Sequence, residues 1–226
     1  MGRGGRCRSP SEWLDGKASD LPDGRLNDLR YLPGKIVAAG GIFCDGPAGW
    51  IVIELCDHRE ASVQSTQLGV ISDTHGDIPS TRKAVRMLES LEVGMVIHCG
   101  DVGSPEVPAL FTKWPTHFVL GNVDKPGDDI LSAIKQAGLV CHGRFGTLTA
   151  QERKIAFLHS DDLRCFRETV DSGDWDLVCY GHTHRADQQH VGATLVLNPG
   201  AISRAWPPTL AVVDLRRMMA HLMEIG

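Results

Sequence analysis

The chain has 226 residues, a hydrophobic fraction of 42%, a charged fraction of 23% and a net charge of −5, which suit one globular domain, or one domain plus an extension. The mild negative charge gives no reason to expect nucleic acid or an anionic membrane as the main partner, because both favour a basic face. No stretch approaches the roughly 20 apolar residues that cross a bilayer, and the seven cysteines form no CxxC pair. We therefore expect a cytoplasmic protein without membrane contact.

The first 66 residues differ in pattern from the rest of the chain. Gly and Pro interrupt them, and their apolar residues show no sustained helical period. Only residues 35–39 and 50–55 have the pattern of short strands. We divide the chain into an N-terminal extension at 1–66, either partly disordered or an artefact of the assigned start, and a domain at 67–226. The lack of Met between Met1 and Met87 leaves both explanations open.

From residue 67 onward, apolar runs alternate with polar turns and helical patterns. The first run is followed by a helix, because Pro79 suits a first helical turn and apolar residues then recur at helical spacing. The early strand-loop-helix-strand order implies right-handed crossovers and a largely parallel start, whereas the later strands lie closer together and look antiparallel. We predict a mixed α/β fold, with strands at 68–71, 95–97, 118–120, 154–158, 177–180, 194–197 and 210–215 and a second helix near 129–137.

Five of these predicted strands, up to the one at 177–180, end in turns that carry Asp, Asn or His beside Gly. Ligands of open α/β sheets bind at the carboxyl ends of strands, so the five turns can converge on one crevice. Glycine lets the backbone bend sharply and approach a metal or a phosphate closely. The side chains expected to converge are Asp73, His75, Asp101, Asn122, His159, His182 and His184.

These seven side chains offer only oxygen and nitrogen atoms. Such a set suits Mn²⁺, Fe²⁺, Co²⁺, Ni²⁺ or Zn²⁺ rather than Ca²⁺. Seven ligands are too many for one ion and suit two ions that share a carboxylate. A single Asp or His at a strand end is usually a cap or a solvated turn residue, but the Gly-His-Thr-His segment at 181–184 places two imidazoles on one side of an extended chain. Separate structural explanations for all five turns are improbable, so we predict a dinuclear metal site.

The ordered motifs are Asp73-Thr74-His75, Gly100-Asp101, Gly121-Asn122-Val123-Asp124, His159 and Gly181-His182-Thr183-His184. Together they resemble the motifs of the calcineurin-like metallophosphoesterase superfamily. The compact size and the segment at 197–201, Leu-Asn-Pro-Gly-Ala, resemble its small single-domain, YfcE-like phosphodiesterase branch. This resemblance implies a four-layer α/β/β/α sandwich of two mixed sheets.

The resemblance also assigns the metal ligands. It implies two divalent ions, with Mn²⁺ favoured over Ni²⁺, Co²⁺, Fe²⁺ and Zn²⁺. Such a pair can bridge a water, lower its pKa and aim hydroxide at phosphorus. One ion would be held by Asp73, His75, Asp101 and His184, and the second by Asp101, Asn122, His159 and His182, with Asp101 as the bridge.

Further roles follow from the same resemblance. Asp101, Asn122 and His159 are expected to act in catalysis, and Asn122 is a neutral ligand that can also contact the phosphate. By position rather than by resemblance, His98, which precedes the Asp101 turn, and Asp124, which follows Asn122, are candidates to support the ligands, as groups around a metal commonly do. Buried packing is the alternative for His98, and helix capping is the alternative for Asp124.

One position departs from the family pattern. Many members have a histidine where this chain has Val123, and that histidine is thought to protonate the leaving oxygen. Valine cannot do so, and general acid catalysis contributes roughly 10²–10⁴-fold. Poor leaving groups should therefore react slowly unless another residue substitutes, and Asp161 and Asp162 are candidates by position alone.

Two classes of function fit these observations. The favoured one is metal-dependent hydrolysis of a small phosphoester, a diester before a monoester. The alternative is a non-catalytic protein-interaction scaffold, because the small retromer subunit has the same fold; a scaffold should tolerate loss of ligands, and all seven are present. A hydrolase acting on nucleic acid is the least favoured for want of a basic groove. The physiological substrate, the native metal and the oligomeric state, a homo-oligomer included, stay open.

Overall fold

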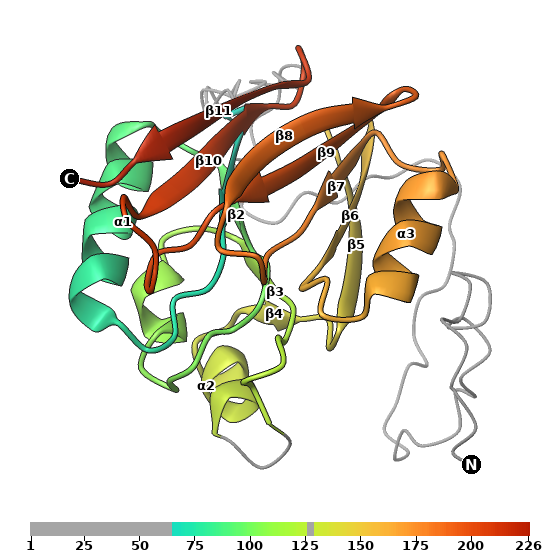
Figure 1. Cartoon of the computed structure of the whole chain (residues 1–226). Helices are drawn as coiled ribbons and strands as arrows, with labels where there is room; N and C mark the ends of the chain where they lie inside the picture. The colour runs from blue at the N-terminus through green and yellow to red at the C-terminus, as the bar shows by residue number, and fades with distance from the viewer. Residues whose placement is uncertain (1–64, 126–128) are drawn as a thin grey trace, which may run out of the picture. The chain divides into compact units, whose positions relative to one another are not determined.

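The computed structural model describes residues 65–125 and 129–226. This part of the chain folds into two mixed sheets with helices on their outer faces (Figure 1). The predicted extension lies outside the described residues apart from residues 65 and 66, and so do the short strands expected at 35–39 and 50–55. Within the described ranges, no helix is long and apolar enough to span a membrane.

The first sheet has the strand order β11-β10-β1-β2-β3-β4. Strands β1 to β4 run parallel, and β10 and β11 add to the β1 edge antiparallel. Parallel neighbours need a crossover, which α1 provides between β1 and β2. The elements are β1 (Gln67–Ile71), α1 (Ile78–Ser90), β2 (Met95–His98), the 3₁₀ helix η2 (Pro108–Phe111), β3 (Thr116–Phe118), α2 (Ile130–Gln136), β4 (Val140–Cys141), β10 (Thr209–Asp214) and β11 (Met219–Glu224).

The second sheet has the strand order β5-β6-β7-β9-β8. Its three inner strands, β6, β7 and β9, run parallel, while β5 and β8 pair antiparallel at the edges. The helix α3 makes the crossover from β6 to β7. The elements are β5 (Phe145–Ala150), β6 (Arg153–Leu158), α3 (Leu163–Asp171), β7 (Leu177–Cys179), β8 (Ala186–Val191) and β9 (Thr194–Pro199).

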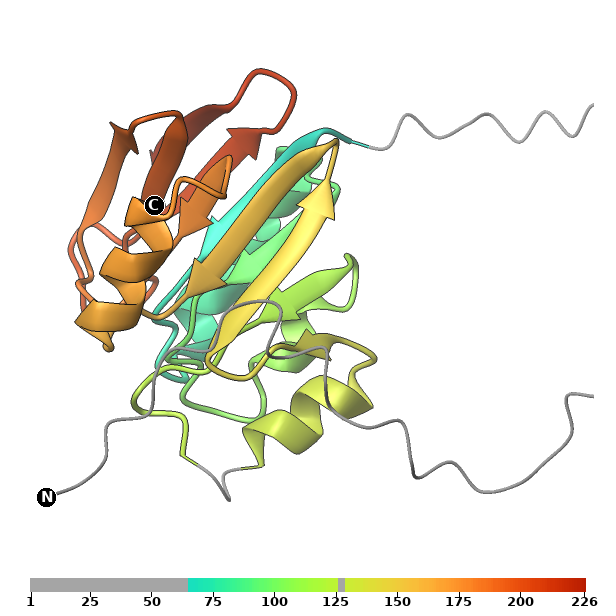
Figure 2. The same cartoon turned by 90° about the vertical axis from the view of Figure 1, so that its right-hand side faces the viewer.

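Three apolar layers hold these elements together. One layer, which includes Leu68 and Phe157, fills the space between the two sheets. A second packs α1, α2 and η2 on the outer face of the first sheet, and a third packs α3 on the outer face of the second. Figure 2 shows the molecule with its α3 side toward the viewer. The four-layer α/β/β/α sandwich implied by the resemblance is confirmed.

The seven predicted strands and both predicted helices are present, but some elements were missed. The strand β8 is exposed along its whole length and has a polar sequence, so it lacks the apolar alternation that predicts a strand. Hydrogen bonding to β9 holds it in the sheet. Among the predicted later strands, the expected antiparallel pairing holds for β10, which pairs antiparallel with β1; the edge strands β5 and β8, which were not predicted, also pair antiparallel with their neighbours. The expectation is wrong for β6, β7 and β9, because the unpredicted helix α3 connects β6 to β7 and the unpredicted strand β8 connects β7 to β9, and each returns the chain for a parallel strand.

The layer between the sheets generates a stability prediction. Phe157 has no exposed surface, so Phe157→Ala should leave a cavity and lower the free energy of unfolding by about 3–5 kcal/mol. Leu131→Ala, at a side chain on α2 that is 56% exposed, is the control and should change it by less than about 0.5 kcal/mol. Equilibrium urea unfolding measures both. A loss below about 1 kcal/mol for Phe157→Ala would contradict the assignment of this core.

Candidate metal centre

Five strand-end loops from the two sheets meet at one edge of the sandwich. They follow β1, β2 and β3 in the first sheet and β6 and β7 in the second. Backbone hydrogen bonds join these loops: the N–H of Asp73 donates to the Gly100 carbonyl at 3.0 Å, and that of Gly181 donates to the His159 carbonyl at 3.3 Å. The sheets themselves are joined where the N–H of His182 donates to Asp73 Oδ2 at 3.1 Å. The predicted convergence of strand ends is therefore present.

Asp73, His75 and His184 form the first group of potential ligands. The Nε2 atoms of the two histidines lie 3.1 Å apart, and His184 Nε2 lies 3.2 Å from Asp73 Oδ1. Asp73 Oδ1 and His75 Nδ1 are buried and have no hydrogen-bond partner among the described residues. A fully buried carboxylate oxygen that lacks a donor is costly unless a cation compensates it.

Asp101, Asn122 and His159 form the second group. His159 Nε2 lies 3.3 Å from Asp101 Oδ1 and 3.1 Å from Asn122 Oδ1. The other ring nitrogen, Nδ1, lies 2.8 Å from the Cys99 carbonyl, which can only accept. Nδ1 therefore carries a proton, and the other ring nitrogen, Nε2, faces the two oxygens.

The Asp101 carboxylate lies between the two groups. Its Oδ1 faces His159, and its Oδ2 lies 3.8 Å from His75 Nε2. His182 completes the cluster, because its ring packs edge-on against His159 with centroids 5.1 Å apart. All seven predicted side chains are thus brought together, and their individual roles as ligands stay predictions.

The chemistry of this cluster fits divalent cations. Two triads, Asp73 with His75 and His184, and Asp73 with Asp101 and His159, have ligand atoms that all lie within 4.8 Å of one another. The donors are nitrogen and oxygen atoms without a thiolate, which suits borderline divalent metals. The unpartnered Asp73 Oδ1 supports the same conclusion from electrostatics.

Five of the seven predicted ligands adopt the left-handed backbone conformation. Residues other than glycine seldom adopt it, and it costs of order 1–3 kcal/mol where it occurs. Hydrogen bonds hold two of these positions, since the N–H groups of Asp73 and His75 donate to Gly100 and Asp101 carbonyls at 3.0 Å. The loops therefore hold a strained backbone that directs these side chains toward the centre. The φ values are +55° for Asp73, +45° for His75, +53° for Asp101, +72° for His182 and +58° for His184.

Two glycines allow the strand ends to approach each other. A Cβ on Gly121 would lie 2.0 Å from Asp101 Oδ1, and one on Gly181 would lie 2.0 Å from Ser72 Oγ. No side chain can occupy either position without moving a ligand loop. Gly121 directly precedes Asn122 and Gly181 directly precedes His182, as expected for glycines that let the loops carrying these ligands bend sharply.

His98 supports the cluster from the core side. It is fully buried and stacks on Phe118, with ring centroids 5.2 Å apart. Its Nδ1 accepts from the Gly100 N–H at 3.2 Å, so its proton is on Nε2, which donates to Thr74 Oγ1 at 3.0 Å. His98 thereby joins the loops that carry His75 and Asp101. Burial lowers the pKa of His98 to about 3, and the ring is neutral at physiological pH.

Asp124 supports the cluster through the backbone. Its carboxylate accepts three N–H groups, from Gly121 at 2.9 Å, Gly103 at 2.9 Å and Val102 at 3.1 Å. These hydrogen bonds tie the loop that carries Asn122 to the loop that carries Asp101. Asp124 therefore supports the ligands by holding the backbone of their loops.

The central carboxylate and imidazole titrate as a pair. Burial would raise the pKa of Asp101, but hydrogen bonds from His159 and the Val123 N–H hold it below its ordinary value. Burial would lower the pKa of His159, but the contact with Asp101 raises it. Burial and the positive charge of Arg204 lower the pKa of His75. Without metal, Asp101 and His159 therefore favour the ion-paired form, whereas His75 favours the neutral form.

The two candidate replacements for the missing acid have other partners. Asp162 caps α3 and accepts from the Arg164 and Cys165 N–H groups at 3.1 Å. Asp161 is ion-paired with Arg144. Neither residue is thus placed to substitute for the family histidine at the position of Val123.

Sequence reasoning missed Arg144. Its Nη1 donates to the Gly121 carbonyl at 2.8 Å, and its Nη2 pairs with Asp161, so it links the loops that follow β3 and β6. Arg144 stands between β4 and β5, in a segment without a recognisable motif. No signal in a single sequence identifies it, because it reaches the centre only through the packing of the two sheets.

Residues 67–218 match the calcineurin-like phosphoesterase superfamily domain. This match spans more than half of the 226 residues, and the chain belongs to this superfamily. The matched region contains all seven predicted ligands.

Individual relatives agree with this membership. A phosphodiesterase of Methanocaldococcus jannaschii is 27% identical over 158 residues, which cover 67% of this chain and 94% of the relative. A probable metallophosphoesterase of Bacillus subtilis is 30% identical over 138 residues, covering 59% and 73%. The solved structure of an archaeal phosphodiesterase is similar at a TM-score of 0.65 and 27% identity, covering 70% of this chain and 99% of that chain. The resemblance to the small phosphodiesterase branch is confirmed.

The buried His98 generates a pH prediction. The pKa of His98 in the folded protein is about 3, below the ordinary 6.5. Between these two pH values, His98 is protonated in the unfolded chain but neutral in the folded protein. The free energy of unfolding should therefore fall as the pH drops from 6.5 toward 3, with a contribution from His98 of about 1.4 kcal/mol per pH unit. His98→Gln removes the titrating group and should show a slope shallower by this amount between about pH 6 and 4. Urea unfolding of both proteins in EDTA measures the slopes, and equal slopes would show that His98 is not kept neutral.

Proposed function

We propose that this member of the calcineurin-like phosphoesterase superfamily hydrolyses phosphodiesters at a centre of two divalent ions. The observation that supports this most is the position of Asp101, whose two oxygens face the two groups of potential ligands. We propose Mn²⁺ as the working metal, since ligand chemistry admits several borderline ions. The names of the relatives support a diester as the substrate.

The seven side chains divide between two ions. Two ions about 3.5 Å apart would supply a water of lowered pKa and would neutralise charge on the phosphoryl oxygens. Asp101 would bind both ions. The first would also be held by Asp73, His75 and His184, and the second by Asn122, His159 and His182.

The protein groups orient the substrate and hold the protons. Asn122 and His182 are exposed, so their side chains can reach a phosphate that approaches from solvent. His159 keeps its Nδ1 proton on the Cys99 carbonyl, which fixes the ring with Nε2 toward the centre. Val123 provides no proton, and the leaving oxygen departs without an acid at that position. Esters with good leaving groups are therefore the favoured substrates.

A non-catalytic scaffold explains these features less well. A scaffold has no need for five strained ligand positions or for a buried carboxylate oxygen without a partner. Both features cost stability, and both are compensated when cations bind. The geometry of the ligands therefore favours an enzyme over a scaffold.

The proposed bridge generates an activity prediction. The protein with Mn²⁺ should hydrolyse bis-p-nitrophenyl phosphate. Asp101→Ala should lose both ions and at least about 10³-fold in kcat/KM, because without the ions nothing lowers the pKa of a water or neutralises the phosphoryl oxygens. Asp162→Ala, which removes the side-chain cap of α3 and no proposed ligand, should keep both ions and most of the activity. Elemental analysis and initial rates measure the two effects.

Two results would overturn this assignment. Retention of two ions by a folded Asp101→Ala protein would exclude Asp101 as the bridge. Absence of turnover with Mn²⁺, Ni²⁺, Co²⁺ and Zn²⁺ in the wild-type protein would favour the scaffold.

Val123 generates a leaving-group prediction. Across diesters that differ only in the leaving phenol or alcohol, kcat/KM should fall steeply as the pKa of the leaving group rises. Alkyl esters should react at least about 10²-fold more slowly than p-nitrophenyl esters, because no acid protonates the departing oxygen. Initial rates for the series give the slope directly. A nearly flat dependence would show that some other residue donates a proton to the leaving oxygen, and would contradict the prediction.

A further inference from the structure

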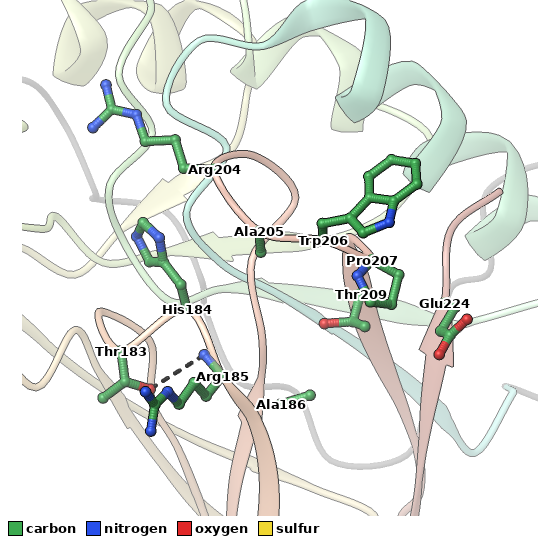
Figure 3. A pocket seen from close by; sticks show the side chains of 10 residues that line it. All are labelled: Thr183, His184, Arg185, Ala186, Arg204, Ala205, Trp206, Pro207, Thr209 and Glu224. Atoms are coloured by element: carbon green, nitrogen blue, oxygen red, sulfur yellow. Dashed lines mark hydrogen bonds between the residues drawn. The ribbon is translucent and has the colours of Figure 1, made fainter.

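A pocket of about 510 Å³ adjoins the metal centre (Figure 3). One wall is the segment after β7, and the other is the loop between β9 and β10 with the end of β11. His184 belongs to this lining and to the first group of potential ligands, so the pocket opens beside the place where a phosphate would bind. The lining includes His184, Arg185, Arg204, Trp206 and Glu224.

The loop that carries Arg204 is tied to the ligand loop after β1. The N–H of Ile202 donates to the Ser72 carbonyl at 3.2 Å, and that of Ser203 donates to the Asp73 carbonyl at 3.1 Å. Arg204 follows directly and adopts a left-handed φ of +60°. These hydrogen bonds fix the start of the Arg204 side chain relative to the metal ligand Asp73. In Figure 3, Arg204 and His184 lie on the same side of the pocket.

Positive charge gathers in this pocket although the whole chain has a net charge of −5. Arg185 and Arg204 line it, against a single carboxylate from Glu224. Two guanidinium groups beside a centre that would bind two divalent ions repel that centre. The arrangement becomes favourable when anionic oxygens lie between them, as the oxygens of a bound phosphate would.

Trp206 stands at the other side of the same pocket. Its side chain is 95% exposed, whereas the other large apolar side chains at the described surface are at most 59% exposed. Its indole projects at the rim, across Ala205 from His184 (Figure 3). Flat, rigid aromatic rings that remain in solvent at the mouth of a site bind ligands by stacking.

We propose that this pocket binds the substituent of the phosphodiester that does not leave, and that this substituent carries a flat aromatic ring, as a nucleoside does. Arg204 binds a phosphoryl oxygen, and Trp206 stacks on the ring. Both residues thereby determine specificity. This inference rests on the proposed function, for which it names the substrate class.

The first experiment uses two diesters with the same leaving group, p-nitrophenyl thymidine 5′-phosphate and p-nitrophenyl methyl phosphate. The Mn²⁺ enzyme should prefer the thymidine ester at least about tenfold in kcat/KM, because stacking of a base on an aromatic side chain is worth about 5- to 150-fold. Trp206→Ala should lower kcat/KM for the thymidine ester about tenfold more than for the methyl ester. Arg204→Gln should lower both equally, about tenfold, because both share the phosphoryl group.

Matched controls come from the surface outside the pocket. Leu163→Ala removes an exposed apolar side chain on α3, and Arg217→Gln removes an exposed guanidinium after β10. Both should leave the rates for both diesters unchanged. An unchanged preference for the thymidine ester in Trp206→Ala would overturn the inference while leaving the proposed hydrolase intact.

A binding measurement separates this inference from catalysis. In the Zn²⁺-loaded protein, thymidine 5′-monophosphate should shift the indole N–H resonance of Trp206, assigned by its loss in Trp206→Phe. It should bind at least about fivefold more tightly than methyl phosphate, and Trp206→Ala should abolish that difference. If no diester is hydrolysed but this binding persists, the proposed function fails and the pocket assignment stands. Equal affinities for the two phosphates in the wild-type protein would overturn the pocket assignment.

Discussion

The centre depends on one electrostatic constraint, which is that two carboxylates and several imidazoles share a largely buried space. Asp73 is fully buried with one oxygen unpartnered, and the Nε2 atoms of His75 and His184 face each other at 3.1 Å. Such a cluster of acceptors is stable only when positive charge compensates it. Contact with Asp101 raises the pKa of His159, which favours the cationic form of that ring, and divalent cations would supply the rest of the positive charge.

The fold is arranged to meet this constraint. Parallel strands in both sheets direct their carboxyl ends to one edge, and glycines at 121 and 181 let the loops approach within distances that no Cβ permits. Left-handed conformations at five ligand positions then aim the side chains inward. His98 and Asp124 tie the loops together from the core, so the strained conformations are held by hydrogen bonds on both sides.

Much of this arrangement could be predicted from the sequence because strand ends, glycines and ligand types coincide along the chain. The seven side chains follow from such local patterns, whereas the layer order was implied by the family resemblance that these motifs carry. Arg144, Arg204 and Trp206 could not be found in this way, since their positions beside the centre or in its adjoining pocket depend on loops whose paths are set by tertiary packing. The strand β8 and the helix α3 were missed for a related reason: their sequences are largely polar, and their position depends on pairing with β9 and on the Asp162 cap.

The central claim is that two cations bind here and share Asp101. The most direct test is an anomalous difference map from crystals of the full chain grown with Mn²⁺. Two peaks about 3.5 Å apart, each within coordination distance of an Asp101 oxygen, are predicted. A single peak, or a pair that leaves Asp101 unbound, would contradict the account.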